Sequence, residues 1–151
     1  GNLASERDQL QVEQSAFTAR LEEEARAEEL AEAVRAEQAA EAAALAERDA
    51  VAAESGFTRS PNDDSIYYRG EGGTCSTFLN CSWLTVLTID DCLAGVYVAS
   101  SLYASENVVI GSGNSITGGL RAGEAALVEI IYPGASGASG FSEVTQANCL
   151  A

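Results

Sequence analysis

"GGTCSTFLNCSWLTVLTIDDC", residues 72–92, contains three of the four cysteines of this chain, and the fourth is Cys149. Structural zinc sites usually take their ligands from two closely spaced cysteine pairs, often with histidine. Here five, ten and 56 residues separate successive cysteines, and the chain has no histidine. A catalytic thiol needs a neighbouring base or cation to lower its pKa, and lysine is absent as well as histidine. Disulfides are therefore the favoured interpretation of these cysteines.

An even number of cysteines in a small β-rich region is typical of disulfide-stabilised domains from oxidising compartments. Four cysteines allow three pairings. We favour Cys75–Cys81, which would close a short loop, and Cys92–Cys149, which would tie the middle of the region to its last strand. By the chain-entropy model, the longer loop adds about 4 kcal/mol to stability. The cysteines thus predict β structure and an extracellular or cell-surface location.

Residues 1–55 are expected to form one long helix. The stretch "EEEARAEELAEAVRAEQAAEAAALAERDA", residues 22–50, consists almost entirely of strong helix formers. Neither glycine nor proline occurs between Asn2 and Glu54. Gly56 is placed to end the helix, and Pro61 prevents any continuation.

Apolar residues recur along this helix at two different spacings. The first three are seven residues apart, which is typical of a left-handed coiled coil. The pairs Leu10–Leu21 and Val34–Leu45 are eleven residues apart, which favours a slightly right-handed one. We favour packing against other copies of the chain. Packing on the chain's own β region, or a solitary helix stabilised by pairs such as Glu22–Arg26, are the alternatives. The candidate packing residues are Leu3, Leu10, Phe17, Leu21, Leu30, Val34 and Leu45.

A change of composition follows the helix. Residues 56–65 are rich in small, polar and turn-forming side chains, which predicts a linker. Residues 66–151 hold seven candidate strands separated by glycine-rich turns, a pattern typical of a β-sandwich. The strands are SIYYRG, STFLN, SWLTVLTID, GVYVASSLYA, NVVIGSG, EAALVEIIYP and FSEVTQANCL, with "GASGASG" as a flexible loop before the last. The expected core residues are Trp83, Val86, Val98, Leu102, Val128 and Ile130.

Trp83 lies in the most apolar of these strands. An exposed tryptophan could act as a stacking platform for a sugar. Sandwich domains, however, often bury a tryptophan against a disulfide. We therefore favour a core role for Trp83.

The charge of the chain excludes several functions. The formal net charge is −15, with −9 in residues 1–55 and −6 in residues 56–151. A nucleic-acid-binding protein needs a basic face, so no nucleic-acid partner is expected, and an anionic membrane surface is disfavoured for the same reason. No segment approaches the roughly 20 apolar residues of a transmembrane helix, so no membrane span is expected.

Residues 98–130, "VASSLYASENVVIGSGNSITGGLRAGEAALVEI", resemble the FxLYD-type immunoglobulin-like domain. Leu102-Tyr103, the apolar stretch 108–111 and residues 120–124 (LRAGE) match the family pattern. Ser100 stands where that family has phenylalanine, and Ala104 where it has aspartate. The wider region 63–149 is similar to small secreted actinobacterial domains that follow Glu/Ala-rich coils. The resemblance implies an extracytoplasmic immunoglobulin-like sandwich without catalytic residues.

Carboxylates offer a second candidate metal site in the sequence, besides the cysteines. The oxygen-bearing side chains that could bind calcium are Asn62, Asp63, Asp64, Glu71, Asp90 and Asp91. Adjacent residues on a strand point to opposite faces, so we favour solvated or turn-capping roles for them. The serines have no histidine partner for a catalytic triad, and no glycine-rich loop with lysine indicates a phosphate site. We expect no metal, no cofactor and no enzymatic activity.

The sequence as a whole predicts an α+β protein. A long N-terminal helix, forming a stalk or coiled coil, precedes a disulfide-stapled, immunoglobulin-like β-sandwich. We expect a structural or assembly protein of the cell surface, a stalk or filament subunit that forms a homo-oligomer through its helix. The alternative is a monomeric binding or adhesion module for a surface carbohydrate or protein. That alternative needs an exposed aromatic patch, drawn from Tyr67, Tyr68, Tyr97 or Tyr103.

Overall fold

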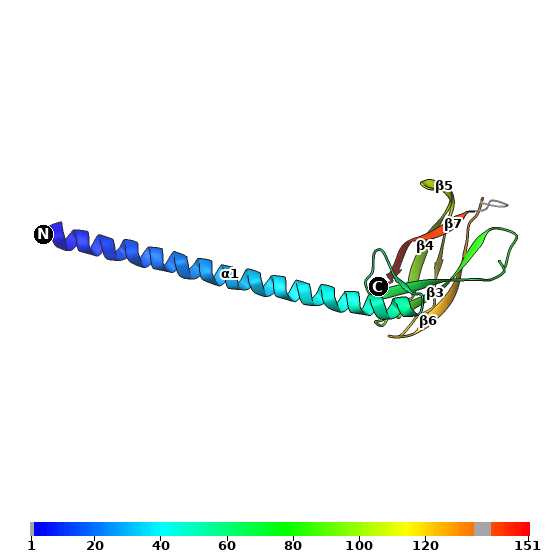
Figure 1. Ribbon diagram of the computed structural model, residues 1–151, viewed down its shortest axis with the longest axis horizontal. Helices are drawn as coiled ribbons and strands as arrows, with labels where there is room; N and C mark the ends of the chain where they lie inside the picture. Colours follow the sequence, from blue (N-terminus) through cyan, green and yellow to red (C-terminus); the bar gives the residue numbers. More distant parts are fainter. Residues whose placement is uncertain (1, 135–139) are drawn as a thin grey trace. The chain divides into compact units, whose positions relative to one another are not determined.

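The computed structural model describes residues 2–134 and 140–151 (Figure 1). The expected class is confirmed, because one long helix precedes two antiparallel sheets that carry two disulfides. The elements are α1 (Asn2–Glu54), β1 (Thr58–Arg59), β2 (Ile66–Glu71), β3 (Cys81–Thr88), β4 (Val96–Ser105), β5 (Val108–Ile116), β6 (Ala125–Ile131) and β7 (Phe141–Cys149). Most of the expected "GASGASG" loop, residues 135–139, lies outside the described residues.

The chain divides into two units, residues 1–46 and residues 47–151. The second, called the two-sheet unit below, includes the last turns of α1 from Glu47 to Glu54. The division between the two compact units falls within α1. No described helix is both long enough and apolar enough to cross a membrane.

The C-terminus of α1 is capped by backbone hydrogen bonds. Gly56 adopts a left-handed conformation with φ of 80°. Its N–H donates to the Ala53 carbonyl at 3.0 Å, and the N–H of Phe57 donates to the Ala52 carbonyl at 3.0 Å. These two bonds form a Schellman motif, which satisfies carbonyls that a helix end otherwise leaves without partners. Gly56 thus ends the helix, as the sequence predicts.

The strands form two sheets with the orders β1-β2-β3-β6 and β5-β4-β7 (Figure 1). Every pairing of named strands is antiparallel. The chain runs through β2 and β3 in the first sheet and through β4 and β5 in the second. It then returns to the first sheet with β6, beside β3, and ends in the second sheet with β7, beside β4. This order places strands that are distant in sequence side by side.

The core lies between the two sheets. Alternate residues of β3 and β6 on one side, and of β4 on the other, are buried, which is the period of two that a half-buried strand requires. In β7 the buried residues Val144 and Ala147 are three apart, because a bulge lies between them. The Tyr132 hydroxyl lies 2.9 Å from that of Ser82 in β3 and 2.8 Å from that of Ser100 in β4, and so connects the sheets through the core. Five of the expected core residues are at most 7% exposed: Val86, Val98, Leu102, Val128 and Ile130.

Trp83, the sixth expected core residue, is not in the core. Along β3, Leu84, Val86 and Thr88 are the buried residues, so the alternation places Trp83 on the outer face of the strand. The indole Nε1 donates a hydrogen bond of 3.1 Å to the Thr74 carbonyl. A Cβ atom at Gly73 would lie 2.8 Å from the indole Cδ1, so this glycine lets the backbone approach the ring closely. The half-buried indole therefore packs under the β2–β3 loop.

Residues 56–65, the expected linker, are part of the two-sheet unit. β1 lies in this segment and pairs with Tyr67 and Tyr68 of β2. The Ser60 hydroxyl donates to the Ala147 carbonyl, and the Asn62 Oδ1 accepts from the Ala147 N–H at 2.8 Å. β7 is an edge strand of its sheet, and its outward-facing backbone groups need partners. The segment supplies them and is thereby held in place.

The expected strand "STFLN", residues 76–80, is an irregular loop. The Cys75 and Cys81 Cα atoms are 5.7 Å apart, whereas six residues of extended chain would span about 20 Å. The disulfide therefore excludes a strand between the two cysteines. The seventh strand is instead the short β1.

Candidate functional site

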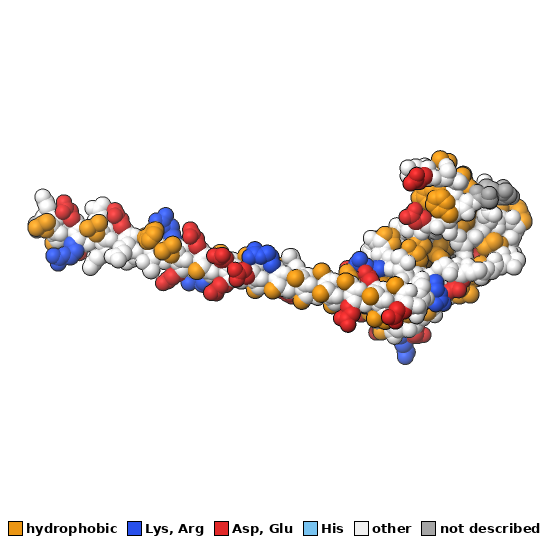
Figure 2. All heavy atoms as spheres, in the orientation of Figure 1, with side chains coloured by type: hydrophobic (Ala, Val, Ile, Leu, Met, Phe, Trp, Pro, Cys, Tyr) orange, Lys and Arg blue, Asp and Glu red, His pale blue; other side chains and the backbone are white. Residues whose placement is uncertain are grey.

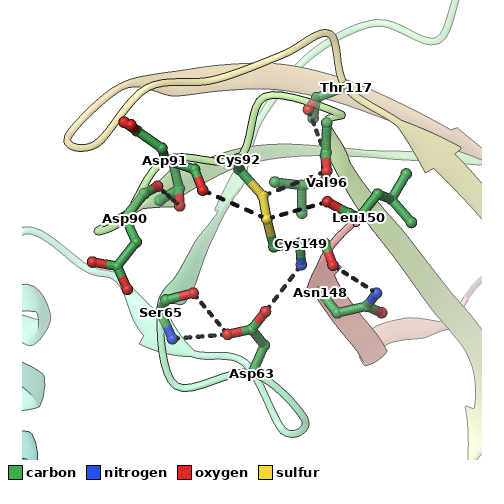
Figure 3. Close-up of a disulfide and its surroundings, with 12 residues drawn as sticks. Asp63, Ser65, Asp90, Asp91, Cys92, Val96, Thr117, Asn148, Cys149 and Leu150 are labelled. Carbon is green, nitrogen blue, oxygen red and sulfur yellow. Dashed lines mark hydrogen bonds between the residues drawn. A yellow bond between two sulfur atoms is a disulfide. The ribbon is translucent and has the colours of Figure 1, made fainter.

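The two disulfides are Cys75–Cys81 and Cys92–Cys149, the pairs that the sequence favoured. The first closes the β2–β3 loop. The second joins the segment after β3 to the last residue of β7, so it connects the two sheets at one end (Figure 3). Cys92 is 1% exposed and also pairs with Leu120 through two backbone hydrogen bonds. The two disulfides therefore hold a loop and a strand end in place.

Asp63 is the polar centre beside the Cys92–Cys149 disulfide (Figure 3). Its Oδ2 accepts from the Cys149 N–H at 2.9 Å, and its Oδ1 accepts from the N–H and hydroxyl of Ser65 at 3.0 and 2.7 Å. Burial raises the pKa of this carboxyl. The three hydrogen bonds to its charged form lower the pKa and together outweigh burial, so the pKa lies below its ordinary value. Asp63 therefore holds the end of β7 in place.

The other candidate calcium ligands do not gather around it. Asp91 accepts from the Ala122 N–H at 2.8 Å, and Asp64 accepts from Arg59 at 2.8 Å. Glu71 accepts from Arg69, which lowers the pKa of its carboxyl, and from Thr85. No group of three acidic or cysteine side chains in residues 2–134 and 140–151 is arranged to hold a metal ion.

The last turns of α1 contact the outer face of β2 through a buried tyrosine. Tyr67 is fully buried, and its hydroxyl donates to Asp49 Oδ1 at 2.6 Å and accepts from Arg48 Nε at 3.2 Å. Burial raises the pKa of the Tyr67 hydroxyl, and the hydrogen bond to Asp49 raises it further. Of the tyrosines proposed for an exposed patch, Tyr67 is therefore excluded by its burial.

Two arginines extend this contact. Arg59 lies 3.3 Å from Asp49 and 2.8 Å from Asp64, so its charge is shared between two carboxylates. The Arg69 guanidinium lies 4.6 Å from the centre of the Phe57 ring, and its Nη1 donates to the Ser55 carbonyl at 3.0 Å. The open hollow of about 480 Å³ between these groups is lined by Asp49, Ala53, Phe57, Thr58, Arg59, Ser60, Pro61 and Asp64. Its charges are paired with each other, which is typical of a structural anchor.

The predicted packing residues of α1 are solvent-exposed in the single chain. Leu3, Leu10, Phe17 and Leu21 are 80, 64, 54 and 50% exposed. Leu30 and Val34 are also exposed, and Leu45 is half-buried. Figure 2 shows hydrophobic, acidic and basic side chains interspersed on the visible side of α1.

These residues form two stripes on different sides of the helix. At about 100° per residue, the four apolar residues from Leu3 to Leu21 fall within about 40° of each other. The later residues Leu30, Val34 and Leu45 lie on average more than about 120° away from them. A single continuous seam along the helix, as in a long coiled coil, is therefore not formed by these side chains.

Charge divides the helix at the same place. Residues 1–21 hold three acids and two arginines, a net charge of −1, whereas residues 22–54 hold 11 acids and three arginines, a net charge of −8. The first apolar stripe thus lies in a nearly neutral segment, and the second lies in a strongly acidic one.

The outer face of the sheet β5-β4-β7 is a second exposed surface. Its residues follow from the strand register, because side chains of paired residues lie on the same face. Four cross-strand rows form it: Ile116–Tyr97–Asn148, Asn114–Ala99–Gln146, Ser112–Ser101–Glu143 and Val109–Tyr103–Phe141. This surface is called the β4 face below. Each end row contains aromatic and aliphatic side chains, with the polar Asn148 also in one of them, and the two middle rows are small or polar.

At one end of the β4 face two aromatic rings stack against each other. The rings of Tyr103 and Phe141 are stacked with centroids 5.4 Å apart and an angle of 16° between their planes. Phe141 is 51% exposed, and Val109 in the same row is 55% exposed. At the other end, Tyr97 is half-buried beside Ile116, which is 60% exposed. Two of the four tyrosines proposed for a binding patch thus lie on one face.

The remaining proposed tyrosine, Tyr68, lies on the inner face of β2, opposite Val86. It is half-buried against the core. Burial raises the pKa of its hydroxyl, and the negative charge of Glu143 raises it further. Tyr68 is therefore separate from the β4 face.

Comparison of the chain with protein-family models, with curated proteins and with solved structures found no match.

Two parts of these sites were beyond sequence analysis. The Arg48–Asp49 pair looks like any solvated pair on an acidic helix, and its partner Tyr67 is 18 residues further along the chain from Asp49. The polar residues of the β4 face come from three strands and depend on the register, including a bulge in β7 between the partners of Ala99 and Ser100. Alternation along each strand could have indicated the outward residues, but not which strands are neighbours.

Proposed function

We propose that the protein is a non-enzymatic structural protein of the cell surface that self-associates through residues 2–21 and displays the two-sheet unit. The observation that carries this proposal is the stripe of Leu3, Leu10, Phe17 and Leu21, each at least 50% exposed. Burying one such side chain contributes about 1.5–3 kcal/mol. Four of them on one side of a helix favour a partner surface of the same kind.

A second copy of the chain is the proposed partner. Residues 1–21 have a net charge of −1, so two such segments approach each other with little repulsion. Residues 22–54 carry −8, and two of these segments repel each other unless salt screens them. The contact is therefore confined to the first part of α1, as a short coiled coil, and it strengthens with salt.

An immunoglobulin-like sandwich is our proposal for the two-sheet unit, in line with the resemblance of residues 98–130 to the FxLYD-type domain. The strand order supports it. β2, β3 and β6 correspond to strands A, B and E of an immunoglobulin domain, β4 and β7 to C and F, and β5 to the edge strand C′. The Cys92–Cys149 disulfide then runs from just after strand B to strand F. The buried tryptophan of antibody domains has no counterpart, because Trp83 lies outside the core.

An extracytoplasmic location is part of the same proposal. Disulfides persist in oxidising compartments and are rare in the cytosol, and the described residues contain two, with no free cysteine. The strong negative charge of the chain favours solubility of the displayed unit.

Sedimentation analysis of the full chain at low and high salt tests self-association. We expect a concentration-dependent oligomer that becomes more stable at high salt. The double variant Leu10→Gln, Phe17→Gln removes two large side chains of the stripe and is expected to sediment as a monomer. The matched control Leu30→Gln, Val34→Gln changes the second stripe and is expected to behave as the wild type. A monomeric wild type, or equal effects of the two variants, contradicts the proposal.

The second candidate function is a binding module, and the β4 face favours it. Tyr97, Tyr103 and Phe141 present aromatic surface on one sheet face of the two-sheet unit. Aromatic side chains that remain exposed often mark interaction sites. In this function α1 acts as a spacer, and the protein is active as a monomer.

A further inference from the structure

The β4 face has a chemical pattern that differs from that of a typical protein interface. Protein interfaces place apolar residues at the centre and polar residues at the rim. On the β4 face the arrangement is reversed, because the aromatic rows around Tyr97 and Tyr103 lie at the ends. The central rows carry an amide from each of Asn114 and Gln146 and the hydroxyls of Ser101 and Ser112.

The charge of the face is also distinctive. Glu143 is the one ionisable side chain in the four rows besides the two tyrosine hydroxyls. Between Gly70 and Ala151 the sequence contains a single basic residue, Arg121, which lies in the turn before β6 and not on this face. Anionic ligands, including nucleic acids and acidic polysaccharides, therefore find no cation on the face to neutralise them. With a single carboxylate and no cation among its twelve residues, the face best suits an uncharged ligand.

Polar groups occupy the centre of the face. Ala99, with a small side chain, lies between Asn114 and Gln146 in its row. The Gln146 Nε2 donates to Asn148 Oδ1 at 2.8 Å, which orients both amides along β7. Such amides and hydroxyls both donate and accept hydrogen bonds, as do the hydroxyl groups of a sugar. The centre of the face thus suits a ligand with many hydroxyl groups.

The aromatic rows are separated along a single strand. Tyr97 and Tyr103 are six residues apart on β4 and point to the same face, so they lie about 20 Å apart. A rigid ring at each end stacks against the apolar faces of sugar rings at low entropic cost. This distance fits several units of an extended chain and exceeds a single sugar.

We propose that the β4 face binds a neutral polysaccharide that lies along β4, with sugar rings stacked on Tyr97 and on the Tyr103–Phe141 pair. This inference rests on the second candidate function, the binding module, and is independent of self-association through α1. The amides of Asn114 and Gln146 bind hydroxyl groups between the two aromatic contacts.

Affinity electrophoresis of the full chain tests this inference. The gels contain hydroxyethylcellulose, laminarin, a yeast mannan or dextran as neutral probes, and alginate as an anionic comparison. We expect at least one neutral polysaccharide to retard the protein and alginate not to retard it. The variants Tyr97→Ala and Tyr103→Ala are each expected to lower the association constant about tenfold. Asn114→Ala is expected to lower it by a smaller factor.

Phe78→Ala is the matched control. Phe78 is 89% exposed in the loop closed by Cys75–Cys81 and lies outside the β4 face. Removing it is expected to leave the association constant unchanged. Circular dichroism of each variant establishes that the fold is intact. Retardation that Phe78→Ala reduces as much as Tyr97→Ala does overturns the proposed site.

The remaining outcomes separate the inference from the functions that precede it. A protein that none of the four neutral polysaccharides retards, but that binds displayed peptides in a Tyr97-dependent way, overturns the sugar assignment and leaves the binding module standing. The absence of both kinds of binding overturns both. The Leu10→Gln, Phe17→Gln variant is expected to bind the same polysaccharides in a Tyr97-dependent way. Its retardation is lower only by the avidity that an oligomer gains on a repetitive polymer.

Discussion

The hydroxyl of the fully buried Tyr67 donates a hydrogen bond of 2.6 Å to Asp49, and this contact joins the last turns of α1 to β2. The same hydroxyl accepts from Arg48, whose Nη2 donates to the Asp64 carbonyl at 2.8 Å. The last turns of α1 are thereby fixed to β2 by side-chain contacts, in addition to the backbone connection through residues 55–65. Residues 55–65, between the helix and β2, are therefore not a flexible linker.

Tyr67→Phe removes the hydroxyl and leaves Asp49 and Arg48 without this partner. We expect the free energy of unfolding of the two-sheet unit to fall by about 1–2 kcal/mol, the cost of losing a hydrogen bond at a buried site. Urea unfolding followed by tyrosine and tryptophan fluorescence measures it. Tyr103→Phe, on the exposed β4 face, is the control, and we expect a change below about 0.5 kcal/mol. Equal effects would show that the Tyr67 hydroxyl does not stabilise the anchor.

Alkaline pH is expected to weaken the same contact. The pKa of Tyr67 is raised above its ordinary value of 10.0, so the folded state keeps a proton that the unfolded state releases. The stabilisation is complete below about pH 10 and is lost as the pH rises towards the folded pKa. Unfolding free energies from pH 8 to 11 should therefore decline. In Tyr67→Phe the decline should be shallower, with the remainder due to Tyr68, whose pKa is also raised.

Low pH is expected to destabilise the two-sheet unit by protonating Asp63. The pKa of its carboxyl lies below the ordinary value of 3.8, so its stabilising effect is present above about pH 4 and is lost as the pH falls through the folded pKa. We expect Asp63→Asn to be less stable than the wild type at pH 7, with the difference shrinking towards pH 2. The exposed Asp90, changed to Asn, is the control. A difference that stays constant with pH would contradict this role of the carboxylate.

The two disulfides are expected to contribute unequally. Cys92–Cys149 spans a sequence separation of 57 residues and Cys75–Cys81 one of six. Loop-closure entropy then predicts losses of about 4 kcal/mol for Cys92→Ala, Cys149→Ala and about 2 kcal/mol for Cys75→Ala, Cys81→Ala. Urea midpoints of the two double variants measure the order. A larger loss from the short loop would indicate that native contacts of residues 72–80 matter more than chain entropy.

Gly113 in β5 is expected to tolerate no side chain. A Cβ atom built there would collide with the backbone carbonyl of Ile131 at the end of β6, where the edges of the two sheets meet. Gly113→Ala should destabilise the two-sheet unit by about 1–3 kcal/mol, as over-packing does. Gly70→Ala is the matched control, since no atom lies within 4 Å of a Cβ there. Its effect on the thermal midpoint should be close to zero or slightly stabilising.

The sequence predicted the parts of the fold that depend on near neighbours. Alanine, glutamate and arginine in long succession specify a helix through local propensity, and Gly56 ends it because a left-handed residue is required there. Alternation in a strand such as Val96–Ser105 specifies which side chains are buried. The spacing of the cysteines and the absence of histidine argued against zinc and favoured the observed disulfides.

Tertiary structure decided what depends on distant residues. Trp83 was expected in the core, but the register of β3 places Leu84 and Val86 inward and the indole outward. Residues 56–65 looked like a linker because their composition is polar, yet that polarity satisfies the edge of β7 through Ser60, Asn62 and Asp63. The β4 face likewise exists only once β5 and β7 flank β4. Propensity acts over a few residues, whereas burial, strand neighbours and side-chain networks depend on the whole folded chain.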